Sequence, residues 1–155
     1  MYVTDNRKYV TYNRKIYKQS IISKNMASIE EHEKTAKELI EDIEEKIRLN
    51  LISKRQKIIG FAVSEASTNL FAIFLHKKNI ISPGFHVNHS FFASQKRAES
   101  TFESDFGNKK EIIAKLVRIE ELRNRLCYGR EKEAKEAQEA ISLLFDLKNL
   151  LEKQQ

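Results

Sequence analysis

The chain has 155 residues, a length that predicts one domain with a single hydrophobic core. One proline and four glycines are too few for the many turns of a β sandwich or barrel. A single cysteine excludes a disulfide framework and an all-cysteine metal site within the chain. With 41% hydrophobic and 32% charged residues, the composition is typical of a soluble protein with charged helix surfaces.

The longest apolar run, from Ile58 to Leu75, is interrupted by polar residues and predicts a buried helix rather than a membrane span. No apolar signal segment follows Met1. We therefore expect a cytoplasmic protein that does not associate with membranes.

The net charge of +6 is concentrated at the N-terminus. Residues 1–25 contain six basic residues and one acidic residue, whereas the other 130 residues contain 22 basic and 21 acidic residues. We therefore predict a basic arm over residues 1–27, extended or disordered, followed by a helical bundle domain over residues 28–153. Three interpretations of the arm stay open: a phosphate-contacting segment, an ill-ordered tail, or sequence upstream of a natural start at Met26.

The spacing of apolar residues predicts five helices in the domain. Ser28 and Glu31 form a capping box that starts the first helix, which ends near Asn50. The second helix is apolar on most of its circumference and should lie centrally in a bundle. The expected ranges of the second to fifth helices are 53–78, 93–105, 108–128 and 131–153.

The loop over residues 79–93 contains the only Pro-Gly pair, which marks a turn, but it is too apolar to be fully solvated. We expect it to pack onto the bundle. Four long helices with short connections predict an all-α fold, an up-and-down bundle of four to five helices.

Arg123 is the most unusual residue of the predicted helix 108–128. Apolar residues recur at four-, three- and seven-residue spacing along this helix, and Arg123 stands near the centre of their face. Because burying an unpaired charge is costly, Arg123 should meet a carboxylate, face a cleft or lie in a subunit interface. A structural ion pair or a snorkelling side chain is the alternative.

The expected partner of Arg123 lies on the one polar strip of the predicted helix 53–78. Glu65, Asn69 and His76 fall within about 40° of one another on that helix. We expect Glu65 to be the carboxylate, with Glu99 and Asp105 as alternatives.

Metal and cofactor signals are weak. His86 and His89 with Cys127 form a poor ligand set, because two ligands would come from a loop and the third from a distant helix. Glycine-rich phosphate loops and the Gly-x-Ser-x-Gly elbow are absent from the sequence. We expect no metal and no other cofactor.

The segment from Glu121 to Arg130 resembles the signature of the HEPN superfamily of helical bundles. That signature has an arginine, a polar residue that is often asparagine, and a histidine about four to six positions after the arginine. Arg123 and Asn124 match its start, whereas Tyr128 occupies the position of the histidine. The resemblance extends over residues 28–153 in the order of the long helices.

The resemblance implies a function at Arg123. Many HEPN members are metal-independent ribonucleases in which two protomers contribute to one cleft. The arginine would bind the scissile phosphate, the polar residue would orient the pair, and the histidine would assist proton transfer. Because tyrosine keeps its proton at neutral pH, Tyr128 is a poor substitute in acid–base catalysis, but it can hydrogen-bond a phosphate or stack on a base.

We therefore expect a HEPN-like homodimer that binds RNA, a nucleotide or a partner protein, such as a nucleotidyltransferase-like antitoxin, without efficient catalysis. The alternative is a metal-independent endoribonuclease of toxin or defence type, completed by Tyr128 or by a histidine from elsewhere. A helical interaction protein without a ligand is the third interpretation. The expected catalytic residues are Arg123, Asn124 and Tyr128, and the expected binding residues are Arg123, Glu65, Asn69 and Arg130.

Overall fold

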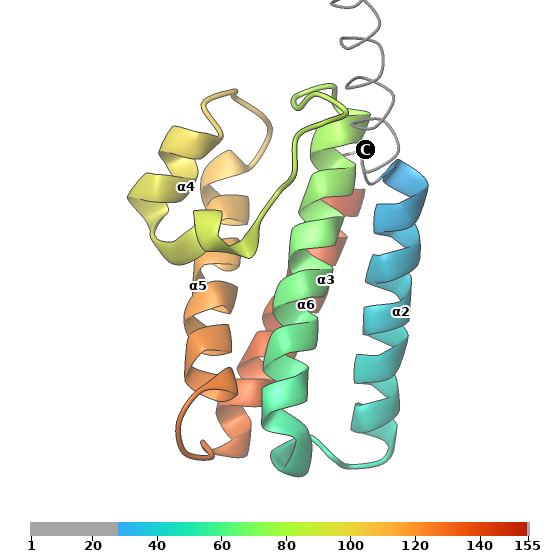
Figure 1. Ribbon diagram of the computed structural model, residues 1–155, viewed down its shortest axis with the longest axis vertical. Helices are drawn as coiled ribbons and strands as arrows, with labels where there is room; N and C mark the ends of the chain where they lie inside the picture. Colours follow the sequence, from blue (N-terminus) through green and yellow to red (C-terminus); the bar gives the residue numbers. More distant parts are fainter. Residues whose placement is uncertain (1–27, 155) are drawn as a thin grey trace, which may run out of the picture.

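The structure, a computed structural model, describes residues 28–154, so the predicted arm over residues 1–27 lies outside the described residues (Figure 1). The described part is helical and contains no strand, which confirms the all-α prediction. Its elements are α2 (Ile29–Arg48), η1 (Ser53–Arg55), α3 (Gln56–Lys77), η2 (His89–Ala93), α4 (Gln95–Thr101), α5 (Lys109–Cys127) and α6 (Ala134–Glu152), where η marks a 3₁₀ helix.

The four long helices run alternately up and down, and α3 lies at the centre (Figure 1). It packs against α2, α5 and α6, as its nearly continuous apolar circumference predicts. The stretch Ser53–Lys77 is long and apolar enough to cross a membrane, but 72% of its most apolar window is buried in the bundle. One such helix is weak evidence for a membrane span, because a buried core helix passes the same test of length and composition.

Local signals in the sequence set the helix ends. At the start of α2, the Ser28 hydroxyl accepts from the Glu31 amide at 3.2 Å, and the Glu31 carboxylate accepts from the Ser28 amide at 2.8 Å. This is the predicted capping box. The α5 helix ends at Cys127, where the backbone of Tyr128 becomes extended, and Gly129 follows with a left-handed φ of +80°.

The prediction of a helix over residues 93–105 is wrong in its length. The α4 helix ends at Thr101, and a separate 3₁₀ helix, η2, precedes it. Phe102 leaves the helix because its ring is 3% exposed and packs against Phe71, with the ring centroids 5.1 Å apart. Tertiary packing of the aromatic ring therefore overrides the local helical pattern.

The apolar segment over residues 79–93 packs onto the bundle, as expected, although its last part, His89–Ala93, is the 3₁₀ helix η2. Val87 is 3% exposed, and Phe92 at the end of the segment is 2% exposed. The ring of Phe92 lies 5.8 Å from that of Phe71 on α3. This packing fixes the position of η2 beside α3 and α5, so the segment carries polar side chains to a defined place on the bundle.

Candidate functional site

Arg123 lies on the buried face of α5, among side chains that are almost fully buried. Leu116, Ile119 and Leu126 are each 2% exposed. The Arg123 side chain is 11% exposed, so its guanidinium is largely removed from water. The helical spacing therefore located this residue correctly.

The carboxylate that Arg123 meets is Glu120 and not Glu65. Arg123 Nη1 lies 3.5 Å from Glu120 Oε1, one helical turn earlier on α5, and the Glu120 side chain is 6% exposed. The prediction of Glu65 is wrong because Ser64, and not Glu65, faces α5 from α3 at this level. Neither Glu99 nor Asp105 forms this ion pair.

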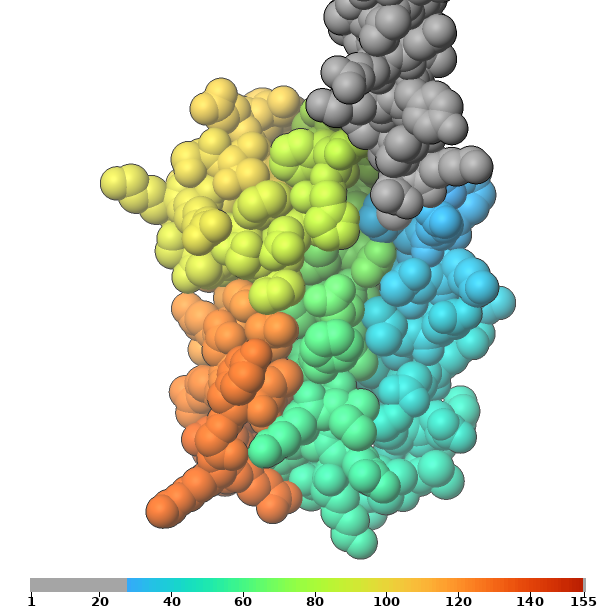
Figure 2. Space-filling model, in the orientation of Figure 1, coloured from blue at the N-terminus to red at the C-terminus, as the bar shows by residue number. Residues whose placement is uncertain are grey.

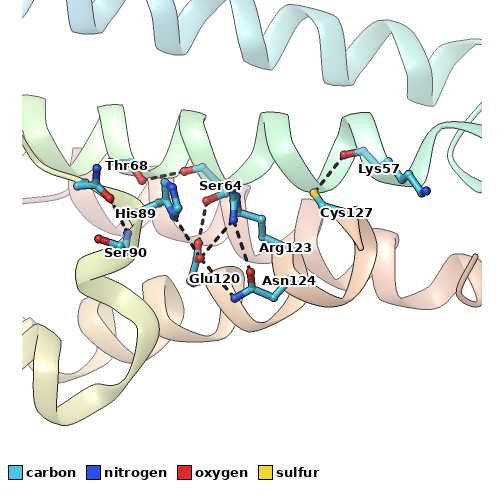
Figure 3. A network of polar contacts seen from close by, with 10 residues as sticks. Lys57, Ser64, Thr68, His89, Ser90, Glu120, Arg123, Asn124 and Cys127 are labelled. Carbon is cyan, nitrogen blue, oxygen red and sulfur yellow. Dashed lines mark hydrogen bonds and ion pairs between the residues drawn. The ribbon is translucent and has the colours of Figure 1, made fainter. Parts of the chain in front are cut away.

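Glu120 is the centre of a polar cluster built by three elements (Figure 3). Its Oε1 accepts from His89 Nδ1 at 3.1 Å and from Asn124 Nδ2 at 3.4 Å. Its Oε2 accepts from Ser64 Oγ at 3.2 Å. We call Ser64, His89, Glu120, Arg123 and Asn124 the Glu120 cluster. It joins α3, η2 and α5.

Most of the hydrogen-bonding capacity of Arg123 is uncommitted. Only Nη1 makes contacts within the described residues, to Glu120 Oε1 and to Asn124 Oδ1, both at 3.5 Å. These are long for hydrogen bonds. The Nε atom is buried and makes no hydrogen bond in the described part of the chain. A guanidinium with free donors in a fixed fork can bind a phosphate through two parallel hydrogen bonds.

His89 is held by Glu120 and leaves one ring nitrogen free. Because the carboxylate accepts from Nδ1, the neutral imidazole carries its proton there and a lone pair on Nε2. Within the described residues Nε2 makes no hydrogen bond, and the side chain is 30% exposed. A carboxylate that orients an imidazole in this way prepares it for general acid–base catalysis.

Sequence reasoning missed Glu120 and Ser64, and it considered His89 as a weak metal ligand or as a histidine that hydrogen-bonds in a loop. Glu120 stands one turn before Arg123, a spacing at which side chains on one helix meet. That spacing was a usable signal. The position of His89 depends on the packing of the apolar loop and has no comparable signal.

The other predicted site residues do not join the Glu120 cluster. Tyr128 is the C-cap of α5 with an extended backbone, and it is 62% exposed. Arg130 is exposed in the following loop. Glu65 and Asn69 line a separate polar cavity of about 120 Å³, which also contains His89 in its wall.

Cys127 is a packing residue in the structure. Its Sγ lies 3.3 Å from the Lys57 carbonyl oxygen, and burial raises the pKa of the thiol above its ordinary value, which disfavours the reactive thiolate. It does not approach the histidines of the η2 region. Among residues 28–154, no group of three His, Cys, Asp or Glu side chains is arranged to hold a metal ion.

Comparisons with protein-family models, curated proteins and solved structures found no match to this chain. The geometry of the Glu120 cluster (Figure 3) and the resemblance of residues 121–130 to the HEPN signature therefore remain the two indications of function.

Proposed function

We propose that the chain is a HEPN-like homodimeric module that binds RNA or a nucleotide through a phosphate group at Arg123. The observation that carries this proposal is that the Arg123 guanidinium is largely buried and yet makes few hydrogen bonds. It is 11% exposed, has only long contacts through Nη1, and has a buried Nε without a hydrogen bond in the described part. A phosphate oxygen could reach the Nη2 donors, which make no hydrogen bond in the described part and, unlike Nε, are not buried.

The neighbours of Arg123 have supporting roles in this proposal. Glu120 and Asn124 contact the guanidinium on its Nη1 side, and Glu120 supplies the negative charge beside it. Tyr128 and Arg130 lie exposed beyond the end of α5, where a ring can stack on a base and a cation can contact a second phosphate. A nucleotidyltransferase-like antitoxin stays a predicted partner.

The test is the binding of a fluorescent single-stranded oligoribonucleotide, measured by anisotropy with the full chain. Arg123→Gln keeps a donor for Glu120 but removes the charged fork, so it should weaken binding at least about tenfold. Arg125→Gln is the matched control, because Arg125 is on the same helix, 56% exposed and paired with Glu136. Equal binding by the two variants would contradict the proposal.

The hydrogen bond of His89 Nδ1 to Glu120, which leaves Nε2 free, favours a second candidate function, a metal-independent endoribonuclease. In this mechanism His89 Nε2 takes the proton of a ribose 2′-hydroxyl, and the resulting oxygen attacks the adjacent phosphorus. The bond to the 5′-oxygen breaks, and that oxygen takes a proton from a general acid or water. The products are a 2′,3′-cyclic phosphate and a free 5′-hydroxyl. Arg123 would stabilise the charge on the phosphorane oxygens.

A cleavage assay with labelled RNA in the presence of a chelator separates the two candidates. The binding module leaves the RNA largely intact. The ribonuclease cleaves it, and both His89→Gln and Arg123→Gln abolish the reaction, since general acid–base help is worth about 10²–10⁴-fold. Cleavage that survives His89→Gln would contradict the assignment of the base.

A further inference from the structure

The polar cavity next to the Glu120 cluster has the properties of a second subsite. It is lined by the polar strip of α3, by α2 and by the segment before η2, and it measures about 120 Å³. A cavity of this size holds several water molecules or one flat heterocycle. His89 belongs both to its wall and to the Glu120 cluster, so the cavity adjoins the Arg123 site. The polar side chains of its wall include His32, Glu65, Thr68, Asn69, His86 and His89.

Two side chains of the wall are committed to each other and fix its shape. Asn69 Nδ2 donates to the Glu65 backbone carbonyl at 2.8 Å, which leaves Asn69 Oδ1 as an acceptor. His32 Nδ1 lies 2.7 Å from that oxygen, so it is the protonated nitrogen of the ring. Thr68 donates to the Ser64 carbonyl at 2.9 Å. The Thr68 hydroxyl, the Nδ1 proton of His32 and one N–H of Asn69 are therefore already used within the protein.

The carboxylate of Glu65 is different, because it has no hydrogen bond or ion pair within residues 28–154. The residue is partly buried, and neither Lys nor Arg lines the cavity. Because Glu65 lines the cavity without a partner among the described residues, its carboxylate offers free hydrogen-bond acceptors there. The cavity therefore suits a ligand that presents N–H donors, and it does not suit a phosphate.

We propose that this cavity binds the base of the nucleotide whose phosphate contacts Arg123, and that it selects guanine through Glu65. The inference rests on the proposed function. The Watson–Crick edge of guanine carries N1–H and N2–H side by side, and one carboxylate accepts both. Adenine and cytosine place a lone pair beside their amino group, and uracil places carbonyl oxygens on both sides of its N–H. Each of these would direct an acceptor at the carboxylate.

The direct test compares the affinities of the full chain for the 5′-monophosphates of guanosine, adenosine, cytidine and uridine, by titration calorimetry. A bidentate contact to a base edge predicts at least about a tenfold preference for the guanine nucleotide. Inosine monophosphate keeps N1–H but lacks the N2 amino group, so its affinity should be intermediate. Equal affinities for all five nucleotides would overturn the inference without any variant.

Glu65→Gln removes one acceptor and places an amide N–H against the guanine donors, so it should abolish the preference while phosphate-dependent binding remains. Glu44→Gln, a change of the same kind at an exposed position of α2, is the control and should keep the preference. A preference that persists in Glu65→Gln would overturn the inference. The same titration with magnesium or manganese alone tests for a cation at Glu65. Binding of either metal that depends on Glu65 would also overturn the inference.

The Arg123→Gln variant separates this inference from the function on which it rests. If the phosphate site at Arg123 and the base site at Glu65 are both correct, Arg123→Gln lowers the affinity for all the monophosphates alike. It leaves the affinity for guanosine, which has no phosphate, unchanged. If affinity does not depend on Arg123 but the guanine preference depends on Glu65, the phosphate site is wrong and the base site stands. If affinity depends on Arg123 but no base is preferred, the base site is wrong.

Discussion

Glu120 is the residue on which the cluster depends. It is 5% exposed and accepts hydrogen bonds from Ser64, His89, Asn124 and Arg123. A buried carboxylate with several donors keeps its charge satisfied even when one donor is removed. Removal of Glu120 is different for Arg123, because Arg123 has no other anionic partner in the described residues.

This asymmetry predicts unequal effects on stability. Glu120→Ala should lower the free energy of unfolding by about 3–5 kcal/mol, because it leaves the largely buried Arg123 without a counter-charge. Arg123→Ala should cost only about 1 kcal/mol, because the other donors still satisfy Glu120. Urea denaturation of both variants measures the difference. A larger loss in Arg123→Ala than in Glu120→Ala would contradict this description of the cluster.

His76 makes the stability of the bundle depend on pH. Burial and, secondarily, the neighbouring His32 lower the pKa of His76 below its ordinary 6.5, and the two rings stack with centroids 5.9 Å apart. The folded state therefore disfavours the proton that the unfolded state takes up below pH 6.5. The neutral His76 therefore costs no stability above about pH 6.5, and the free energy of unfolding falls as the pH drops below that value.

The expected result is a lower melting temperature at about pH 5.5 than at about pH 7.5, with part of the difference removed by His76→Gln. The Glu33–Lys77 ion pair lies beside this histidine pair and is present in both proteins, so the comparison isolates the imidazole. An identical pH dependence in the variant would rule out His76 as the titrating group.

At the scale of the helices, α3 and α5 lie too close at Gly60 for any larger residue. A Cβ atom added there would lie 2.8 Å from Leu126 Cβ and 3.2 Å from Cys127 Sγ. Leu126 Cβ is tied to the α5 backbone and cannot move away as a flexible side-chain end can. This close approach holds the end of α5, and therefore Arg123, against α3.

Gly60→Ala should therefore destabilise the protein by about 1–3 kcal/mol, although alanine is the better helix former. In Gly107→Ala, by contrast, the added Cβ would meet only the end of the flexible Gln154 side chain, so the effect should be small. Thermal unfolding of both variants tests this. If Gly60→Ala is as stable as the parent, the close approach does not constrain α5.

The elements show which parts of the structure were predictable from the sequence. The start of α2 follows from a capping box, which acts within a few residues of the chain, and Gly129 lies two residues beyond the end of α5. The early end of α4 depends on the contact of Phe102 with Phe71, which is distant in sequence. In the same way, Arg123 was found from helical spacing alone, whereas His89 was not, because the fold of the loop carries it to Glu120.

At the scale of the whole molecule, the exposed large apolar residues gather at one end of the bundle. Among residues 28–154 they are Ile47 and Leu49 near the end of α2, Ile58 and Phe61 in the first turns of α3, and Tyr128 at the end of α5. The space-filling view shows the teal start of α3 uncovered at the lower end of the molecule (Figure 2). Such a grouping is typical of an interaction surface.

We expect this surface to form the proposed homodimer. Light scattering at micromolar concentration should report twice the mass of the chain, and Phe61→Glu should shift the protein toward the monomer, because it places a charge on an apolar interface. Glu44→Gln, at an exposed position of α2, should leave the mass unchanged. A monomer at all concentrations would contradict the dimer while leaving the Arg123 site in place.

The most direct measurement of the central claim is a crystal structure of the full chain with guanosine 5′-monophosphate bound. We predict that a phosphate oxygen lies within about 3 Å of Arg123 Nη2, which has no hydrogen bond in the described residues and, unlike Nε, is not buried. A nucleotide bound with its phosphate away from Arg123, with the guanidinium still in contact only with Glu120 and Asn124, would contradict the account.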